Sequence, residues 1–148
     1  MSLKDWVGNG WLRPHEPTRM EIAGLCAIVD RDLLDCGRDI SPDWRFGIAY
    51  NAALKLCTVL LHASGYRAEK LQQHHRTVTA LPLILGESHR EDAEYLDNCR
   101  MKRNTVEYDM VGAATAQDAA ELAAYAKELR EVVLIWLTKN HPELVGEP

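Results

Sequence analysis

Glycine-rich loops and closely spaced cysteines are missing from this sequence, and their absence excludes several kinds of site. Gly8 and Gly10 lie near each other, but they lack the surrounding strand and helix of a phosphate-binding loop. The 4 cysteines are widely separated, so no Cys-x-x-Cys pair is present to form a zinc knuckle or a redox centre. We therefore expect reduced thiols that are mostly buried.

Long apolar runs are missing as well. A membrane-spanning helix requires about 20 predominantly apolar residues, and no apolar run in this chain approaches that length. The N-terminal stretch MSLKDWVGNG has no apolar core of a secretion signal. Both features predict a cytoplasmic protein that does not enter a membrane.

A broad excess of positive charge is also absent. The formal net charge is -5 at pH 7, whereas a protein that coats nucleic acid non-specifically needs a broad basic face. Local groups of cations do occur, at residues 66–76 and 100–103. With 148 residues, 47% of them hydrophobic and 26% charged, the chain is expected to form one domain in which a small anion site remains possible.

Helical periodicity dominates the rest of the sequence. Apolar residues recur three and four positions apart, and residues that favour helix caps precede several of these stretches. Thr18 and Glu21 have the spacing of a capping box, and Pro82 is expected to kink or divide the helix that contains it. We expect essentially no strands. The predicted helices run from Thr18 to near Gly37, from Ser41 to Gly65, from about His75 to Leu85, from Ser88 to Arg103 and from Thr115 to about residue 140.

These elements predict an all-α fold, an up-and-down bundle of four to five antiparallel helices over residues 17–140. Trp6 and Trp11 are too large and apolar for a disordered tail, so residues 1–16 are expected to pack on the bundle or on a partner. Residues 141–148 are expected to form a C-terminal tail.

The stretch from Arg100 to Asp109, RMKRNTVEYD, concentrates polar chemistry that a hydrophobic core does not need. Its cations Arg100, Lys102 and Arg103 repel one another, so the helix dipole, neighbouring acids or an anionic partner must offset the repulsion. One interpretation is a helix C-terminus with favourable cations. The other is a binding site for an anion.

Three segments in this order resemble the HEPN family, small helical domains often found beside nucleotidyltransferases and in toxin–antitoxin systems. Ala49–Leu54 is similar to part of the second long helix of that family, His74–Val78 to the start of its next helix, and Arg103–Tyr108 to its signature. The resemblance implies a HEPN-like bundle that forms a homodimer with paired sites facing a shared cleft. It also implies a cognate nucleotidyltransferase or antitoxin protein as a candidate partner.

Catalytic members of the family are metal-independent ribonucleases with an arginine, four to six intervening residues and a histidine. The signature carries over to Arg103 and Asn104, but Tyr108 stands where the histidine would be. RNA cleavage by a 2′-hydroxyl needs a group that exchanges protons near neutral pH. Tyrosine has an unperturbed pKa of about 10 against about 6.5 for histidine, so it would need about 4 kcal/mol of tuning. We therefore expect RNA or nucleotide binding without strong ribonuclease activity.

The expected roles follow from the side chains of the signature. Arg103 would hold a phosphate, Asn104 would orient it, and Tyr108 would hydrogen-bond to a base or stack on it. If the protein is an enzyme, these three residues are its catalytic candidates. The additional candidates for anion binding are Arg100, His75 and Arg76.

The histidines do not form a recognisable metal motif. His74 and His75 are adjacent, so on a helix their side chains point about 100° apart. His62 and His89 can still converge with them in space, but neither a His-Glu-x-x-His nor a Glu-x-x-His pair occurs. We predict no metal and no cofactor.

Two other functions stay open. A metal-independent ribonuclease toxin of a toxin–antitoxin pair would use Tyr108, or a histidine donated from elsewhere in the fold. A non-catalytic protein-interaction bundle would present the Trp6 and Trp11 segment to a partner protein.

Overall fold

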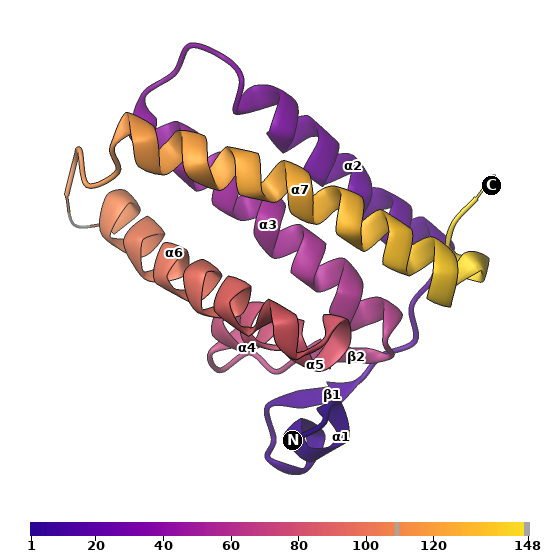
Figure 1. Cartoon of the computed structure of the whole chain (residues 1–148). Coiled ribbons are helices and arrows are strands. Elements are labelled where there is room, and N and C mark those ends of the chain that lie inside the picture. The colour runs from indigo at the N-terminus through magenta and orange to yellow at the C-terminus, as the bar shows by residue number, and fades with distance from the viewer. Residues whose placement is uncertain (109, 147–148) are drawn as a thin grey trace.

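The computed structural model describes residues 1–108 and 110–146, without the side chains of residues 107 and 108. Its long helices are α2 (Arg19–Asp35), α3 (Pro42–Ala63), α6 (Arg90–Tyr108) and α7 (Ala116–Asn140). Successive long helices run in opposite directions, and α3 contacts α2, α6 and α7 (Figure 1). The fold is therefore an all-α bundle, as the sequence predicts.

Short elements precede, connect and follow the long helices. They are α1 (Leu3–Gly8), β1 (Leu12–Pro14), β2 (Tyr66–Ala68), α4 (Gln73–Thr79), α5 (Leu81–Leu85) and the 3₁₀ turns η1 (Glu87–His89) and η2 (Pro142–Leu144). β1 and β2 pair antiparallel, with Leu12 opposite Ala68. The expectation of essentially no strands misses this small sheet, because three-residue strands are too short to show an alternating pattern.

Most of the predicted helix boundaries are confirmed. The predicted end at Arg103 is wrong, because α6 continues for five more residues to Tyr108. Pro82 divides the third predicted helix into α4 and α5. The hydroxyls of three predicted caps each accept the backbone N–H three residues later, and these caps are Thr18, Ser41 and Thr115. The predicted cap at Ser88 is wrong. Ser88 lies inside η1, an extra turn that follows Gly86 at φ +109°, and α6 begins only at Arg90.

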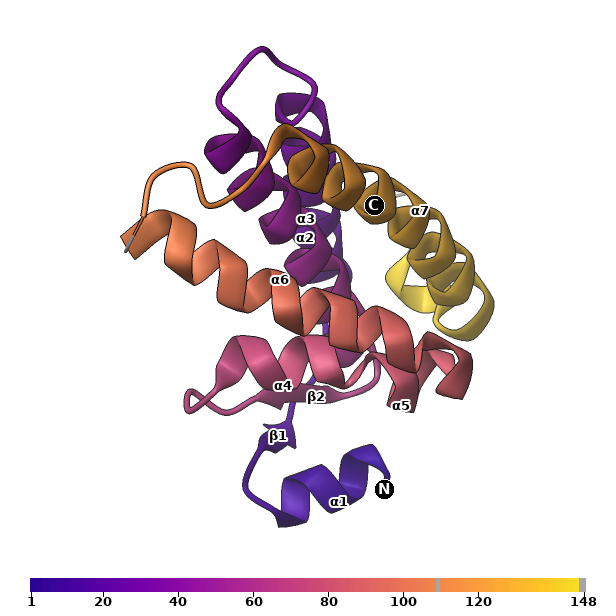
Figure 2. The ribbon, with the colours of Figure 1, turned by 60° about the vertical axis from the view of Figure 1, so that its left-hand side comes forward.

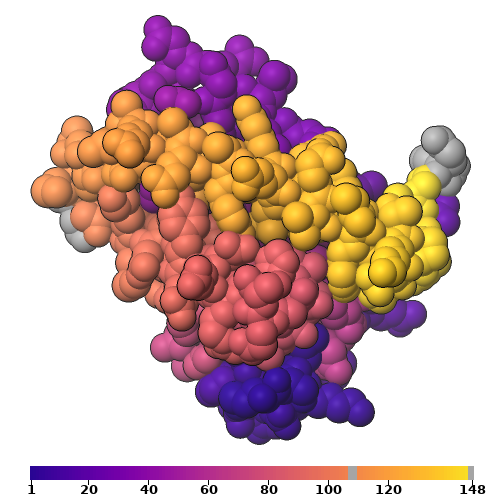
Figure 3. Space-filling model, viewed as in Figure 1, coloured from indigo at the N-terminus to yellow at the C-terminus, as the bar shows by residue number. Residues whose placement is uncertain are grey.

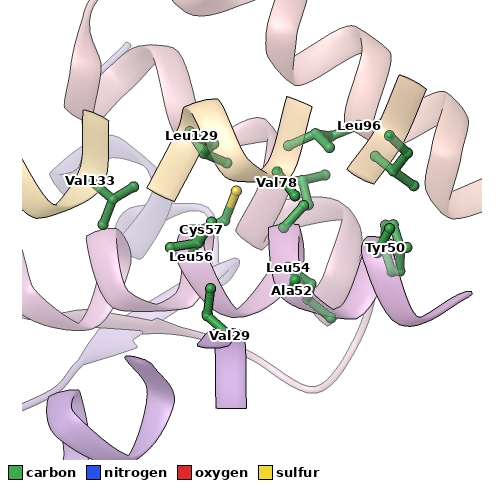
Figure 4. Packing of buried hydrophobic residues seen from close by; sticks show 14 of the residues in the cluster. Val29, Tyr50, Ala52, Leu54, Leu56, Cys57, Val78, Leu96, Leu129 and Val133 are labelled. Carbon is green, nitrogen blue, oxygen red and sulfur yellow. The ribbon is translucent and has the colours of Figure 1, made fainter. Parts of the chain in front are cut away.

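α3 supplies the centre of the hydrophobic core. Its buried side chains meet Val29 of α2, Leu96 of α6 and Leu129 of α7 (Figure 4). Among the described residues, α3 is the one helix that is long and apolar enough to cross a membrane. However, 67% of its most apolar stretch is buried inside the bundle. Such burial is typical of the core helix of a soluble protein.

The cysteines are free thiols, as expected from the sequence, and three of the four are buried. Cys99 is 5% exposed, and burial raises its pKa to about 11. A thiol with so high a pKa is rarely a thiolate at neutral pH, so Cys99 fills space in the core and is not a nucleophile.

The N-terminal segment packs on one end of the bundle, next to β2 (Figure 2). Trp6 is 7% exposed and belongs to a small cluster with Leu12, Leu61 and Ala80, while the ring of Trp11 meets the Trp6 ring edge-on at 5.5 Å. In the space-filling view this segment is the indigo lobe at one edge of a face formed largely by α6 and α7 (Figure 3).

Candidate nucleic-acid interface

α3 keeps one partly exposed stripe along an otherwise buried helix. We call this set the α3 stripe, and it consists of Trp44, Ile48, Asn51 and Lys55. These residues follow one another three or four positions apart, so they share one helical face. The Trp44 side chain is 69% exposed, and the other three are half-buried. The central core helix therefore presents an aromatic ring, an amide and a cation along one line on its open face.

A cavity of about 700 Å³ lies over the N-terminal half of the α3 stripe. Its wall comes from three helices and the loop after α6, through Arg31, Asp32, Ser41, Asp43, Trp44, Gly47, Ile48, Asn51, Arg103, Val106 and Val111. Cavities of about 300–1,000 Å³ with apolar walls and a few polar groups are typical of small-molecule sites. The volume and lining therefore fit a ligand of the size of a nucleotide.

The acidic groups of the cavity are bound within the protein. Asp32 is 4% exposed and accepts hydrogen bonds from Asn51 Nδ2 at 2.7 Å and from Arg31 Nε at 3.0 Å. Asp43 accepts two backbone N–H groups of the loop after α6, at 2.7 and 3.2 Å. Arg31 offsets the negative charge of Asp32, and the backbone N–H donors stabilise the carboxylate of Asp43. The second pair of bonds also fixes this loop against the start of α3.

Arg103 is positioned at the edge of the cavity by a buried ring. Its Cζ lies 5.7 Å from the centroid of the Tyr50 ring on α3, and Tyr50 is 1% exposed. Burial raises the pKa of Tyr50 above its usual value, so the phenol stays neutral. Attraction between a guanidinium and an aromatic face contributes about 0.5–2 kcal/mol, depending on how much water is excluded.

Further basic side chains gather beside Arg103. Arg100 shares its helical face, since the two residues are three positions apart on α6. The pKa of His74 on α4 is lowered, first by burial and then by the positive charges of Arg103, Lys55 and Arg100. Because these charges act on one imidazole, the four side chains occupy one neighbourhood. We call Arg100, Arg103, Lys55 and His74 the basic cluster.

The other described side chains of the predicted Arg100–Tyr108 stretch do not belong to the basic cluster. Lys102 points away from the basic cluster, and its Nζ lies 2.9 Å from Asp118 Oδ2 on α7. Asn104 is exposed on α6. Tyr108 is the last residue of α6, but its side chain lies outside the described residues, so its role stays a prediction.

His75 and Arg76 have partners within the chain. His75 Nδ1 lies 2.9 Å from Asp97 Oδ1, which also accepts a hydrogen bond from Arg100 Nε at 2.8 Å. Burial raises the pKa of Asp97, but the hydrogen bonds from Arg100 and His75 outweigh it and leave that pKa low. The guanidinium of Arg76 lies over Trp11, 3.5 Å from the ring centroid. His75 thus borders the basic cluster through Asp97, while Arg76 contacts the N-terminal segment.

Comparisons with known proteins do not identify a relative. No protein-family model, curated protein or solved structure matches this chain. The resemblance to HEPN proteins therefore stays a prediction, and the function must be argued from the chemistry of the site.

His74 and the α3 stripe are the parts of the site that the sequence does not predict. The sequence predicts His75 as the anion ligand of the adjacent pair, but His74 is the histidine that lies beside the arginines. A usable signal was present in α3, because Trp44, Asn51 and Lys55 are polar or bulky exceptions on one face of a strongly apolar helix.

A second group of side chains lies further along α3. His62 does not converge with His74, His75 or His89, but with His15 and Glu21, and one ligand atom from each of the three residues lies within 4.8 Å of the other two. Two imidazoles and a carboxylate are a donor set that can hold a metal ion.

Proposed function

We propose that this protein binds single-stranded RNA or a nucleotide in the groove formed by the α3 stripe, the cavity and the basic cluster. The observation that carries the proposal is the position of Arg103, which lines the cavity and also belongs to the basic cluster. Arg103 thus connects the cavity, which has an aromatic and aliphatic wall, to the basic cluster. We further propose that binding occurs without strong ribonuclease activity.

The cavity suits the base of a nucleotide, and the basic cluster suits its phosphate. Trp44, Ile48 and Val106 give the cavity an apolar wall, and a base that stacks on an aromatic ring gains about 1–3 kcal/mol. The amide of Asn51 lies in the same wall as a polar group for a base edge. Arg103 and Arg100 are suited to the phosphate, because a guanidinium can donate two parallel hydrogen bonds to its oxygens.

A single strand fits this site better than a duplex. Base edges and faces are accessible in single-stranded loops and ends, whereas a duplex is held mainly through its backbone. A long basic face would be needed for a duplex, and the formal net charge of -5 argues against one.

Weak cleavage is expected because the arginines cannot exchange a proton. Arginine remains protonated in proteins, so Arg100 and Arg103 can hold a phosphate but cannot act as a base. Tyr108 in place of the family histidine supports the same expectation, because the tyrosine pKa is poorly matched to neutral pH.

A metal-independent endoribonuclease is the second candidate, and the position of His74 favours it. Burial and the cations around His74 keep its pKa low, so the neutral imidazole predominates at pH 7. A neutral imidazole next to phosphate-binding arginines has the character of a general base. His74 would then be the histidine donated from elsewhere in the fold.

The proposal extends to a cytoplasmic homodimer with a cognate nucleotidyltransferase or antitoxin as its partner protein. Trp44 and Val111 support a dimer, since they leave 69% and 93% of their surface exposed at the rim of the cavity. A second copy could cover this apolar rim and enlarge the groove. Sedimentation equilibrium measures the oligomeric state directly.

The experiment that tests the proposal is binding and cleavage of a labelled RNA pool that includes tRNA, in the presence of EDTA. Wild type is compared with Arg103→Ala and with Arg90→Ala. Arg90 is a matched control, because it lies on the same helix and pairs with Glu87 away from the cavity. We expect Arg103→Ala to weaken binding at least tenfold, Arg90→Ala to change it less than twofold, and the RNA to remain intact.

Equal binding by wild type and Arg103→Ala would refute the site. Cleavage by wild type that disappears in His74→Ala would replace the binding proposal with the ribonuclease.

A further inference from the structure

The carboxylate of Glu21 lies between two imidazoles. His15 Nε2 is 2.8 Å from both carboxylate oxygens, and His62 Nδ1 is 2.5 Å from Oε1. The two imidazole rings are tilted against each other with centroids 4.5 Å apart. Three potential metal ligands thus direct one nitrogen or oxygen atom each toward a common point.

Each of these side chains is held in place by a different element. The backbone N–H of His15 donates to Gly65 O at 2.8 Å, next to the pairing of β1 with β2. Thr18 caps α2 and so fixes Glu21 in the first turn of that helix. His62 lies in the last turn of α3. Three separate segments converge on the site, so its geometry is set by the fold as a whole.

Glu21 departs from the role that its sequence position predicts. In a complete capping box its carboxylate would accept the backbone N–H of Thr18. Only the Thr18 half of the box forms, and the Glu21 carboxylate bonds the two histidines. The Glu21 carboxylate is therefore available as the anionic member of the donor set.

We propose that His15, Glu21 and His62 form a binding site for one divalent transition-metal ion of the Zn²⁺ type. Bond lengths of about 2.0–2.2 Å in a tetrahedral site place neighbouring ligand atoms about 3.3 Å apart. The present separations of 2.5 and 2.8 Å are shorter, so a metal would replace the shared protons after these ligand atoms move apart by about 0.5–0.8 Å.

Three protein ligands leave a fourth position for water or an anion. The side chains of His15, Glu21 and His62 are 17%, 27% and 15% exposed, so solvent reaches the site.

This site is distinct from the basic cluster. His62 follows Lys55 by seven residues on α3, a rise of about 10 Å along the helix. Arg103→Ala leaves all three proposed ligands in place, so the metal site and the RNA site can fail independently.

The test is a Zn²⁺ titration of metal-free, untagged protein in competition with a chromophoric chelator, with stoichiometry read by native mass spectrometry. We expect wild type to bind one Zn²⁺ per chain and Glu21→Gln and His62→Ala to lose at least tenfold in affinity. His89→Ala is the matched control, since His89 also bonds a carboxylate, that of Asp92 at 3.0 Å, but belongs to no three-ligand group among the described residues. We expect it to bind as wild type does.

A second measurement distinguishes loss of the metal site from loss of the fold. Co²⁺ added to wild type should give the visible absorption bands of a tetrahedral site, and these bands should be weak or absent in Glu21→Gln, which keeps the size of the side chain. Absence of one-to-one binding in wild type would overturn the proposal. So would Zn²⁺ affinity that survives in both His15→Gln and Glu21→Gln, because the metal would then be held elsewhere.

Discussion

At the scale of single residues, two tryptophans have opposite surroundings and opposite expected roles. Trp6 is 7% exposed in the N-terminal cluster, and Trp44 is 69% exposed at the cavity. We predict that Trp6→Ala lowers the free energy of unfolding by about 3 kcal/mol, as loss of a buried ring does. Trp44→Ala should change it by less than about 0.5 kcal/mol, yet weaken RNA binding about tenfold. Urea unfolding and fluorescence anisotropy measure the two effects, and a strong loss of stability in Trp44→Ala would contradict its exposed position.

His74 provides a residue-scale test by pH. In the folded protein its pKa lies below the ordinary value of a histidine, first because of burial and then because of the charges of Arg103, Lys55 and Arg100. The unfolded chain therefore binds a proton more readily, so stability falls as the pH drops from about 7 through the folded pKa. We predict that His74→Gln flattens this part of the stability curve, measured by urea unfolding at several pH values. Identical slopes in variant and wild type would contradict the basic environment.

At the scale of elements, the junction between α6 and α7 is stabilised by one capping box. Thr115 Oγ1 accepts the N–H of Asp118, and the Asp118 carboxylate accepts the N–H of Thr115 and binds Lys102 of α6. We predict that Thr115→Ala costs about 1 kcal/mol of unfolding free energy. Thr138→Ala, at an exposed position near the other end of α7, should cost clearly less. Equal costs would show that the cap contributes nothing specific.

The elements also show which features a sequence can predict. The caps at Thr18, Ser41 and Thr115 are local, since each joins residues three positions apart, and a reader of the sequence can find them. The cap at Ser88 fails because the turn after Gly86 postpones the start of α6. Contacts between distant segments, such as His15 with His62, depend on how β1 pairs with β2, and no local pattern encodes that pairing.

The candidate site also combines features that local helical spacing predicts with features that depend on contacts between distant segments. That Arg100 and Arg103 share a face and Lys102 points elsewhere follows from helical geometry alone. The convergence of Lys55 and His74 on those arginines needs the packing of α3 and α4 against α6, which the sequence leaves open.

At the scale of the whole molecule, a formal net charge of -5 surrounds a local basic cluster, so attraction to RNA should be short-ranged and sensitive to salt. For single strands the logarithm of the binding constant falls by about 0.7 per phosphate contact for each unit of the logarithm of salt concentration. We predict that Arg103→Ala reduces this slope by about 0.7, while Arg90→Ala leaves it unchanged. Anisotropy titrations over a range of salt concentrations measure it, and an unaltered slope in Arg103→Ala would mean that Arg103 contacts no phosphate.

The most direct test of the binding groove is an NMR titration of ¹⁵N-labelled protein with a short single-stranded RNA. We predict chemical-shift changes at the Trp44 indole, Ile48, Asn51 and the Arg103 region of α6, together in one saturating transition. Shifts confined to the Trp6 and Trp11 segment, or no shifts at all, would contradict it.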